Sequence, residues 1–122
     1  MRRSGFYLAF VALFLGLGTS PVMAQTVREF MSSADRIPRN ATALLHPATR
    51  RLMGELRTAF TTVRSEQEAR VSRGQPRTIC MPERVSMDAQ KIETRFRSIP
   101  EARRNITVTQ AVREWMAEEY PC

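Results

Sequence analysis

The chain has 122 residues, among them 19 basic and 12 acidic side chains and one histidine, which gives a formal net charge of +7. A chain of this length forms one small domain. Its arginines are spread along the sequence instead of being clustered with aromatic residues, which argues against nucleic-acid binding.

The first 24 residues have the three parts of a cleavable secretory signal. Two arginines open the chain, residues 6–18 are uncharged and mostly apolar, and small residues precede a cleavage point before Gln25. The apolar run is shorter than the roughly 20 residues that a transmembrane helix needs. We therefore predict a signal peptide over 1–24 and a periplasmic or secreted domain over 25–122, with an uncleaved N-terminal anchor as the alternative.

The exported part carries 17 basic and 12 acidic residues, a net charge of +5, and Lys91 is its only lysine. This charge suits an acidic protein, an anionic membrane surface or an anionic wall polymer. It is equally the charge of a solvated surface with ion pairs between helical residues. No second apolar run follows residue 24, so no membrane-spanning segment is expected in the exported part.

Hydrophobic periodicity predicts four helices and no strand. Thr26 is a suitable N-cap for the first helix, and Pro38 ends it. Residues 39–46 form a connector, and we expect its Leu44 and Leu45 to tuck under the second helix.

The second helix is the longest and is expected over 47–73. Pro47 suits a first helical turn, and Gly74 suits a C-terminal stop. The residues of its apolar stripe are Leu52, Leu56, Ala59, Phe60 and Val63. Two i,i+4 ion pairs are expected on its outer faces: Arg51–Glu55 and Glu66–Arg70. The stripe thins after Val63, so we expect a solvated far end, and the stripe is buried within the domain or partly across a dimer.

After a loop over 74–85, Ser86 is expected to cap the third helix, which Pro100 ends. Thr107 and Gln110 fit a capping box for the fourth helix. The inward faces are Ala89, Ile92, Phe96 and Ile99 in the third helix and Val108, Ala111, Val112 and Trp115 in the fourth. The fold class is therefore all-α, a small four-helix domain with one long helix.

Cys80 and Cys122 are the only cysteines. An even count in an exported chain favours a disulfide, and only one pairing exists. This bond would close the last two helices as a C-terminal helical hairpin. A metal site or a reactive thiol pair is the alternative, although two cysteines with no nearby histidine do not complete a zinc site.

No catalytic, metal-binding or cofactor-binding constellation stands out. The single histidine, His46, precedes Pro47 and is expected to mark the entry of the long helix. The best candidate contact surface lies around the third helix and its exit loop, where four arginines offer bidentate recognition of carboxylate or phosphate. These are Arg95, Arg97, Arg103 and Arg104. A solvated surface is the alternative.

The C-terminal part has a recognisable order of motifs. It runs Cys80-Met81-Pro82, an amphipathic helix, Pro100, a second amphipathic helix, and Tyr120-Pro121-Cys122. This order resembles the second half of the Tai-type immunity proteins, small exported bacterial proteins that bind and block cell-wall amidase effectors delivered by type VI secretion. A long charged helix stands here in place of that family's Gly/aromatic segment. The chain also resembles small exported proteins of alphaproteobacteria.

The resemblance implies a non-enzymatic exported binding protein, an immunity or inhibitor protein that sterically blocks an envelope-acting enzyme. Its partner is expected to be a protein of the cell envelope, without a cofactor. A second hypothesis is a periplasmic stress protein or chaperone of the HdeA kind, which would expose apolar surface in acid. A third hypothesis, an enzyme, has no supporting constellation of residues.

Overall fold

The computed structural model describes residues 24–122, and the predicted signal peptide over 1–24 lies almost entirely outside them. Within the described part the chain is all-helical, with four α-helices and two 3-10 turns and without β-strands, as predicted. The elements in chain order are α1 (Val27–Ala34), η1 (Ala41–Leu45), α2 (Pro47–Ser72), α3 (Ala89–Ser98), η2 (Glu101–Arg103) and α4 (Val108–Glu119).

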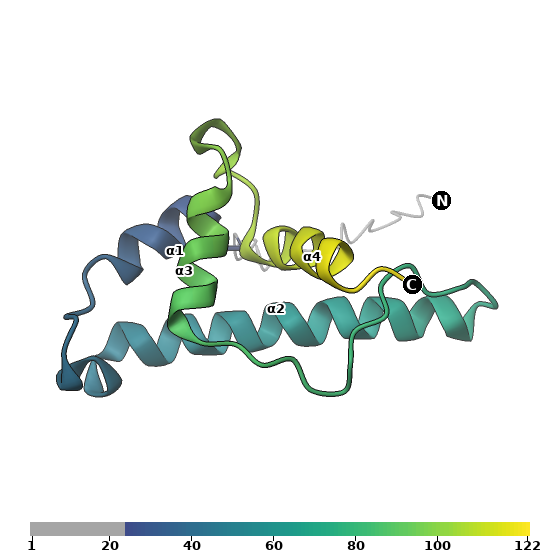
Figure 1. Ribbon diagram of the computed structural model, residues 1–122, viewed down its shortest axis with the longest axis horizontal. Helices are drawn as coiled ribbons and strands as arrows, with labels where there is room; N and C mark the ends of the chain where they lie inside the picture. Colours follow the sequence, from purple (N-terminus) through teal and green to yellow (C-terminus); the bar gives the residue numbers. More distant parts are fainter. Residues whose placement is uncertain (1–23) are drawn as a thin grey trace, which may run out of the picture.

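Helix α2 has 26 residues and runs along the longest dimension of the molecule (Figure 1). Helix α4 runs beside its C-terminal half in the same direction, and α1 lies over its beginning. Helix α3 rises steeply away from α2, so the two helices of the disulfide-closed hairpin, α3 and α4, are splayed apart. Among residues 24–122, none of the helices combines the length and apolar character that crossing a membrane requires.

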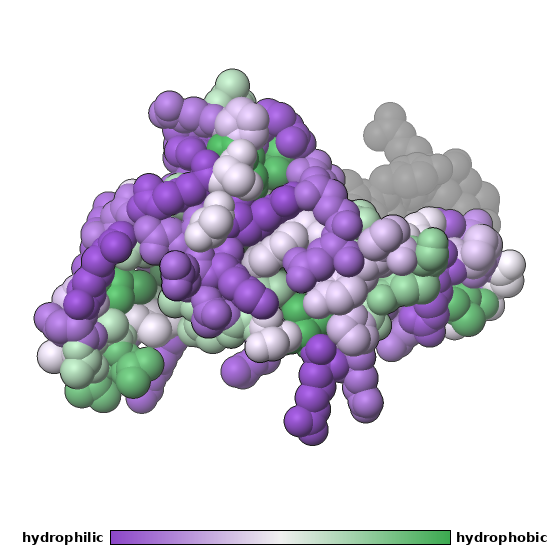
Figure 2. Space-filling model, viewed as in Figure 1, coloured by the Kyte–Doolittle hydropathy of each residue, from purple (hydrophilic) through white to green (hydrophobic). Residues whose placement is uncertain are grey.

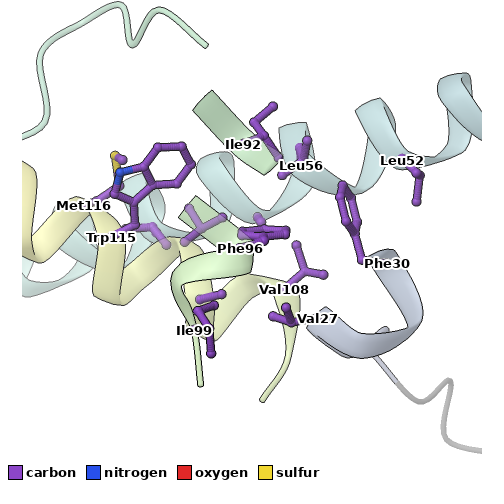
Figure 3. Packing of buried hydrophobic residues seen from close by; sticks show 14 of the residues in the cluster. Val27, Phe30, Leu52, Leu56, Ile92, Phe96, Ile99, Val108, Trp115 and Met116 are labelled. Carbon is purple, nitrogen blue, oxygen red and sulfur yellow. The ribbon is translucent and has the colours of Figure 1, made fainter. Parts of the chain in front are cut away.

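One apolar core joins all four helices (Figure 3). The predicted stripe of α2 is buried at Leu52, Leu56, Ala59 and Val63, because a spacing of three or four residues brings these side chains to one face. Phe30 of α1 meets Phe96 of α3 edge to face, with ring centroids 5.1 Å apart. All the core residues of the described chain fall between Val27 and Met116, so the segment 25–122 contains its whole core.

The helix starts follow local capping rules. The Thr26 and Thr107 side chains accept hydrogen bonds from the backbone N–H groups of Glu29 and Gln110, as their positions predict. His46 caps α2, since its Nδ1 accepts from the Ala48 N–H at 3.1 Å. At the other end, Gly74 has the positive φ of 73° that glycine tolerates after a helix.

The predicted cap of α3 is wrong by two residues. Asp88, not Ser86, accepts the hydrogen bond from the Lys91 N–H, at 2.8 Å. A carboxylate is both a good acceptor and favourably charged for the positive end of a helix dipole, which favours Asp88 over the serine. Because the helix begins at Ala89, that residue is exposed, in contrast to its predicted inward position.

Leu44 and Leu45 are also placed differently from the prediction. Each is 78% exposed instead of being tucked under α2. The reason is the tight η1 turn, in which Asn40 accepts from the Thr42 N–H and the Thr49 hydroxyl donates to the Ala43 carbonyl. This bonding fixes the backbone and turns both leucines outward.

The predicted disulfide is present. Cys80 and Cys122 are joined, with their Cα atoms 5.0 Å apart. The Cys80 N–H donates to the Tyr120 carbonyl at 2.8 Å, and Ile79 forms an antiparallel bridge with Pro121. The bond therefore ties the loop after α2 to the end of α4, and it is compatible with an oxidising exported compartment.

The first prediction concerns this disulfide. Cys80→Ser/Cys122→Ser will lower the melting temperature by at least several degrees, because the open chain gains entropy over the 42 residues that the bond closes. Thermal unfolding followed by circular dichroism measures the shift. Equal melting temperatures for the variant and the parent would mean that the bond adds nothing to stability.

Candidate functional site

The chain between α3 and α4 forms a projecting corner, residues 100–105, at the top of Figure 1. Ile99 is buried at its base, whereas Pro100, Ala102 and Asn105 are exposed. Backbone hydrogen bonds run inside it from the Arg103 N–H to the Pro100 carbonyl and from the Arg104 N–H to the Glu101 carbonyl, at 2.8 and 3.2 Å. We call residues 100–105 the corner.

Arg104 braces the corner from inside. Its Nε donates to the Ile99 carbonyl at 3.0 Å, and its Nη2 donates to the Arg97 carbonyl at 3.2 Å. These are carbonyls at the end of α3 that lack partners within the helix. Arg104 thus holds the chain direction where the helix stops, and its guanidinium is used within the molecule.

Helix α1 braces the corner from the side. The Arg28 N–H donates to the Arg104 carbonyl at 3.0 Å, and its Nη2 donates to the Glu101 carbonyl at 2.8 Å. Arg103 reaches in the other direction and pairs with Glu114 of α4 at 2.8 Å. Three elements therefore fix a turn whose tip remains in solvent.

The other two predicted contact arginines leave α3 toward different neighbours. Arg95 pairs with Glu118 of α4 at 2.5 Å. Arg97 pairs with Glu93 on its own helix and with Asp35 beside α1, at 3.0 and 3.2 Å. The structure thus places Arg103 and Arg104 in the corner and leaves Arg95 and Arg97 as ties between helices, so the four do not form one free patch. Their role in partner binding stays a prediction.

Sequence reasoning missed a second surface along the seam between α2 and α4. The predicted ion pair between Glu66 and Arg70 is not formed. Arg70 instead donates through Nε to the Pro76 carbonyl. Glu66 pairs with Arg113 of α4. The Nε and Nη2 atoms of Arg113 donate hydrogen bonds to the two carboxylate oxygens of Glu66, at 2.8 and 2.6 Å. This double hydrogen bond lowers the pKa of Glu66 from 4.5.

The far end of α2 is less solvated than predicted, because Gln67 is buried with 5% exposure. Its Oε1 accepts from the backbone N–H groups of Thr78 and Ile79 at 2.9 and 3.1 Å. The side-chain amide of Gln67 therefore satisfies backbone N–H groups of the loop after α2, as a neighbouring strand would do in a sheet. Its spacing of four residues from Val63 was the available signal, since it continues the buried stripe with a polar residue.

Beside the seam, an open groove of about 830 Å³ runs along α2. It is rich in guanidinium and hydroxyl groups, and its lining includes Arg57, Thr61, Ser65, Arg70, Arg73 and Arg113. Glu66 is the one acidic residue in that lining. The groove can donate hydrogen bonds to carboxylates, but its residues come from α2, α4 and the loop, so no single sequence segment reveals it.

In residues 24–122, no group of three or more His, Cys, Asp or Glu side chains is arranged to hold a metal ion. His46 is occupied as the cap of α2. Comparison of the chain with protein-family models, curated proteins and solved structures gives no match in any of the three.

The second prediction tests the buried amide. Gln67→Ala will lower the free energy of unfolding by about 1–3 kcal/mol, because it strands the buried Ile79 N–H without an acceptor. Chemical denaturation measures the loss. Glu68→Ala is the matched control, because Glu68 is the next residue in the chain and its side chain is exposed. Equal losses in the two variants would contradict the role given to Gln67.

The third prediction concerns acid. Because Arg113 lowers the pKa of Glu66 in the fold, this pair stabilises the protein above pH 4.5 and loses its effect as the pH falls below that value. Glu55 has the opposite effect on the pH dependence of stability, because burial raises the pKa of its carboxyl group. Glu66→Gln will therefore flatten the fall in stability below pH 4.5, which denaturation at a series of pH values measures. An unchanged pH profile would contradict the assignment.

Proposed function

We propose that this protein is an exported, non-enzymatic binding protein that sterically blocks an envelope-acting enzyme by inserting the corner into the enzyme's cleft. The observation that carries the proposal is the bracing of residues 100–105 by Arg28, Arg103 and Arg104. A loop held in one conformation before binding loses little entropy when it is bound. That property favours a blocking wedge over a flexible tether.

The composition of the corner supports the same role. Pro100 and Ala102 give it a small, exposed apolar tip. Glu101 and Arg103 lie beside the tip and keep more than half of their side chains in solvent, although each is held in an ion pair by α1 or α4. A small tip with polar flanks fits a concave site, where anchors in desolvated pockets supply most of the binding energy. The motif order of residues 80–122, which resembles Tai-type immunity proteins, supports a cell-wall amidase as the class of target.

The fourth prediction tests the corner. Ala102→Arg will weaken binding and inhibition of the captured partner by at least about tenfold, because a long charged side chain blocks insertion of the tip. Ala117→Arg makes the same change at an exposed alanine of α4 and will leave both unchanged. The partner is first captured from envelope extracts with residues 25–122, and its hydrolase activity is then titrated with each variant.

Two results would contradict the proposal. One is a stoichiometric partner that the Ala102→Arg variant still binds and inhibits like the parent protein. The other is the absence of any envelope enzyme whose activity falls when the protein is added. Equal loss for Ala102→Arg and Ala117→Arg would point to a binding surface elsewhere.

The ion pairs between helices favour one second candidate, an acid-activated periplasmic chaperone. Arg113 lowers the pKa of Glu66, and Arg95 lowers the pKa of Glu118. Both pairs link α4 to another helix and disappear when their carboxylates are protonated. Acid-dependent binding of many unfolded clients, together with binding of an apolar dye, would support this candidate over the inhibitor.

A further inference from the structure

The end of the molecule opposite the C-terminus carries two bare leucines. Leu44 and Leu45 are each 78% exposed, more than any other large apolar side chain in residues 24–122. They lie in η1, where the chain turns into α2 at the lower left of Figure 1. Figure 2 shows an apolar patch at this end, bordered by hydrophilic surface. We call these two residues the leucine tip.

The outward position of the leucine tip is built into the fold. The turn is closed by the Thr49 hydroxyl, which donates to the Ala43 carbonyl at 2.6 Å, and by Asn40, which accepts from the Thr42 N–H at 2.9 Å. The cap by His46 then fixes the start of α2 directly after the leucines.

The segment that carries the leucine tip is basic, and we call its four arginines, Arg36, Arg39, Arg50 and Arg51, the collar. Residues 36–51 contain four arginines and no acidic residue. Arg39 pairs with Glu93 but keeps a side chain that is 80% exposed. Arg36 and Arg50 are exposed and take part in none of the ion pairs found among residues 24–122. Arg36 and Arg50 therefore keep their positive charge facing solvent.

We propose that the leucine tip seats this protein on an anionic phospholipid surface. The two leucines enter the boundary between headgroups and acyl chains, and the arginines of the collar contact lipid phosphates. Apolar insertion and attraction to anionic headgroups together give stable peripheral binding where either one alone is weak. This inference is independent of the proposed function, because it concerns where the protein acts and not what it blocks.

The charge and size of this surface favour a membrane over another copy of the chain. Pairing two leucine tips would bring the two collars together, and Arg36 and Arg50 of each copy take part in none of the ion pairs among residues 24–122 that would offset their charge. Two side chains also offer far less area than the roughly 1,000 Å² that a specific protein interface needs. A lipid surface requires no matching shape, and its headgroups supply the opposite charge.

The arrangement of the two surfaces is compatible with this seating. The leucine tip and the corner project from the molecule at different places, the lower left and the top of Figure 1. A protein held by the leucine tip would therefore leave residues 100–105 free for a partner.

Vesicle co-sedimentation tests the inference with residues 25–122, which contain every core residue of the part of the chain that the structure describes. Vesicles with about one-third phosphatidylglycerol in phosphatidylcholine are compared with pure phosphatidylcholine. We expect binding to the anionic vesicles alone, weakening as salt is added. Leu44→Ser/Leu45→Ser will weaken it by at least about tenfold, and Arg36→Gln/Arg50→Gln by a similar factor. Val71→Ser, at an exposed apolar residue of α2 far from the leucine tip in the sequence, will bind like the parent.

Three results would overturn the inference. The parent protein would fail to bind anionic vesicles, or the double leucine variant would bind them as tightly as the parent. The third result is that the parent protein does not bind vesicles but forms a dimer in sedimentation velocity, and that Leu44→Ser/Leu45→Ser does not form this dimer. That result would assign the leucine tip to contact with a second copy. Circular dichroism of each variant checks that the fold is intact.

Discussion

The packing of α4 along α2 is the contact on which the rest of this structure depends. A single long helix is not stable in water without a partner for its apolar face, and here Val112 and Met116 of α4 are fully buried in the core that the α2 stripe completes. Three further devices act at the same seam: the disulfide, the Glu66–Arg113 pair and the buried amide of Gln67. The seam also holds α4 where Arg103 of the corner and Arg95 of α3 pair with it, through Glu114 and Glu118.

The elements that follow from local rules could be read from the sequence. Apolar residues at helical spacing place the stripe of α2, and short polar side chains at Thr26 and Thr107 place two helix starts. The disulfide follows from the cysteine count and the expected compartment. In each case the information lies within a few residues or in a pairing that has no alternative.

Features that depend on tertiary partners could not be read in this way. Glu66 has Arg70 four residues away, yet α4 brings it a better-aligned arginine at position 113. Pro100 and the arginines around it mark the corner in the sequence, but nothing in that sequence tells that Arg104 turns inward to the end of α3. The exposure of Leu44 likewise depends on a hydroxyl from α2 that closes the η1 turn.

The internal use of arginine explains much of the basic composition. Arg28, Arg64 and Arg104 donate to backbone carbonyls of neighbouring segments, so they serve as braces in a small domain. This explains why a net charge of +5 over residues 25–122 does not by itself indicate a polyanionic ligand. At the leucine tip, in contrast, Arg36 and Arg50 are exposed and take part in none of the ion pairs found among residues 24–122.

Backbone ¹⁵N relaxation of the free protein tests the bracing of the corner most directly. Order parameters of about 0.85 at residues 100–105, equal to those of α4, are the predicted result. Values below about 0.6 would mean that the corner moves freely on the picosecond to nanosecond timescale. That outcome would contradict a preformed wedge and remove the basis of the proposed blocking mechanism.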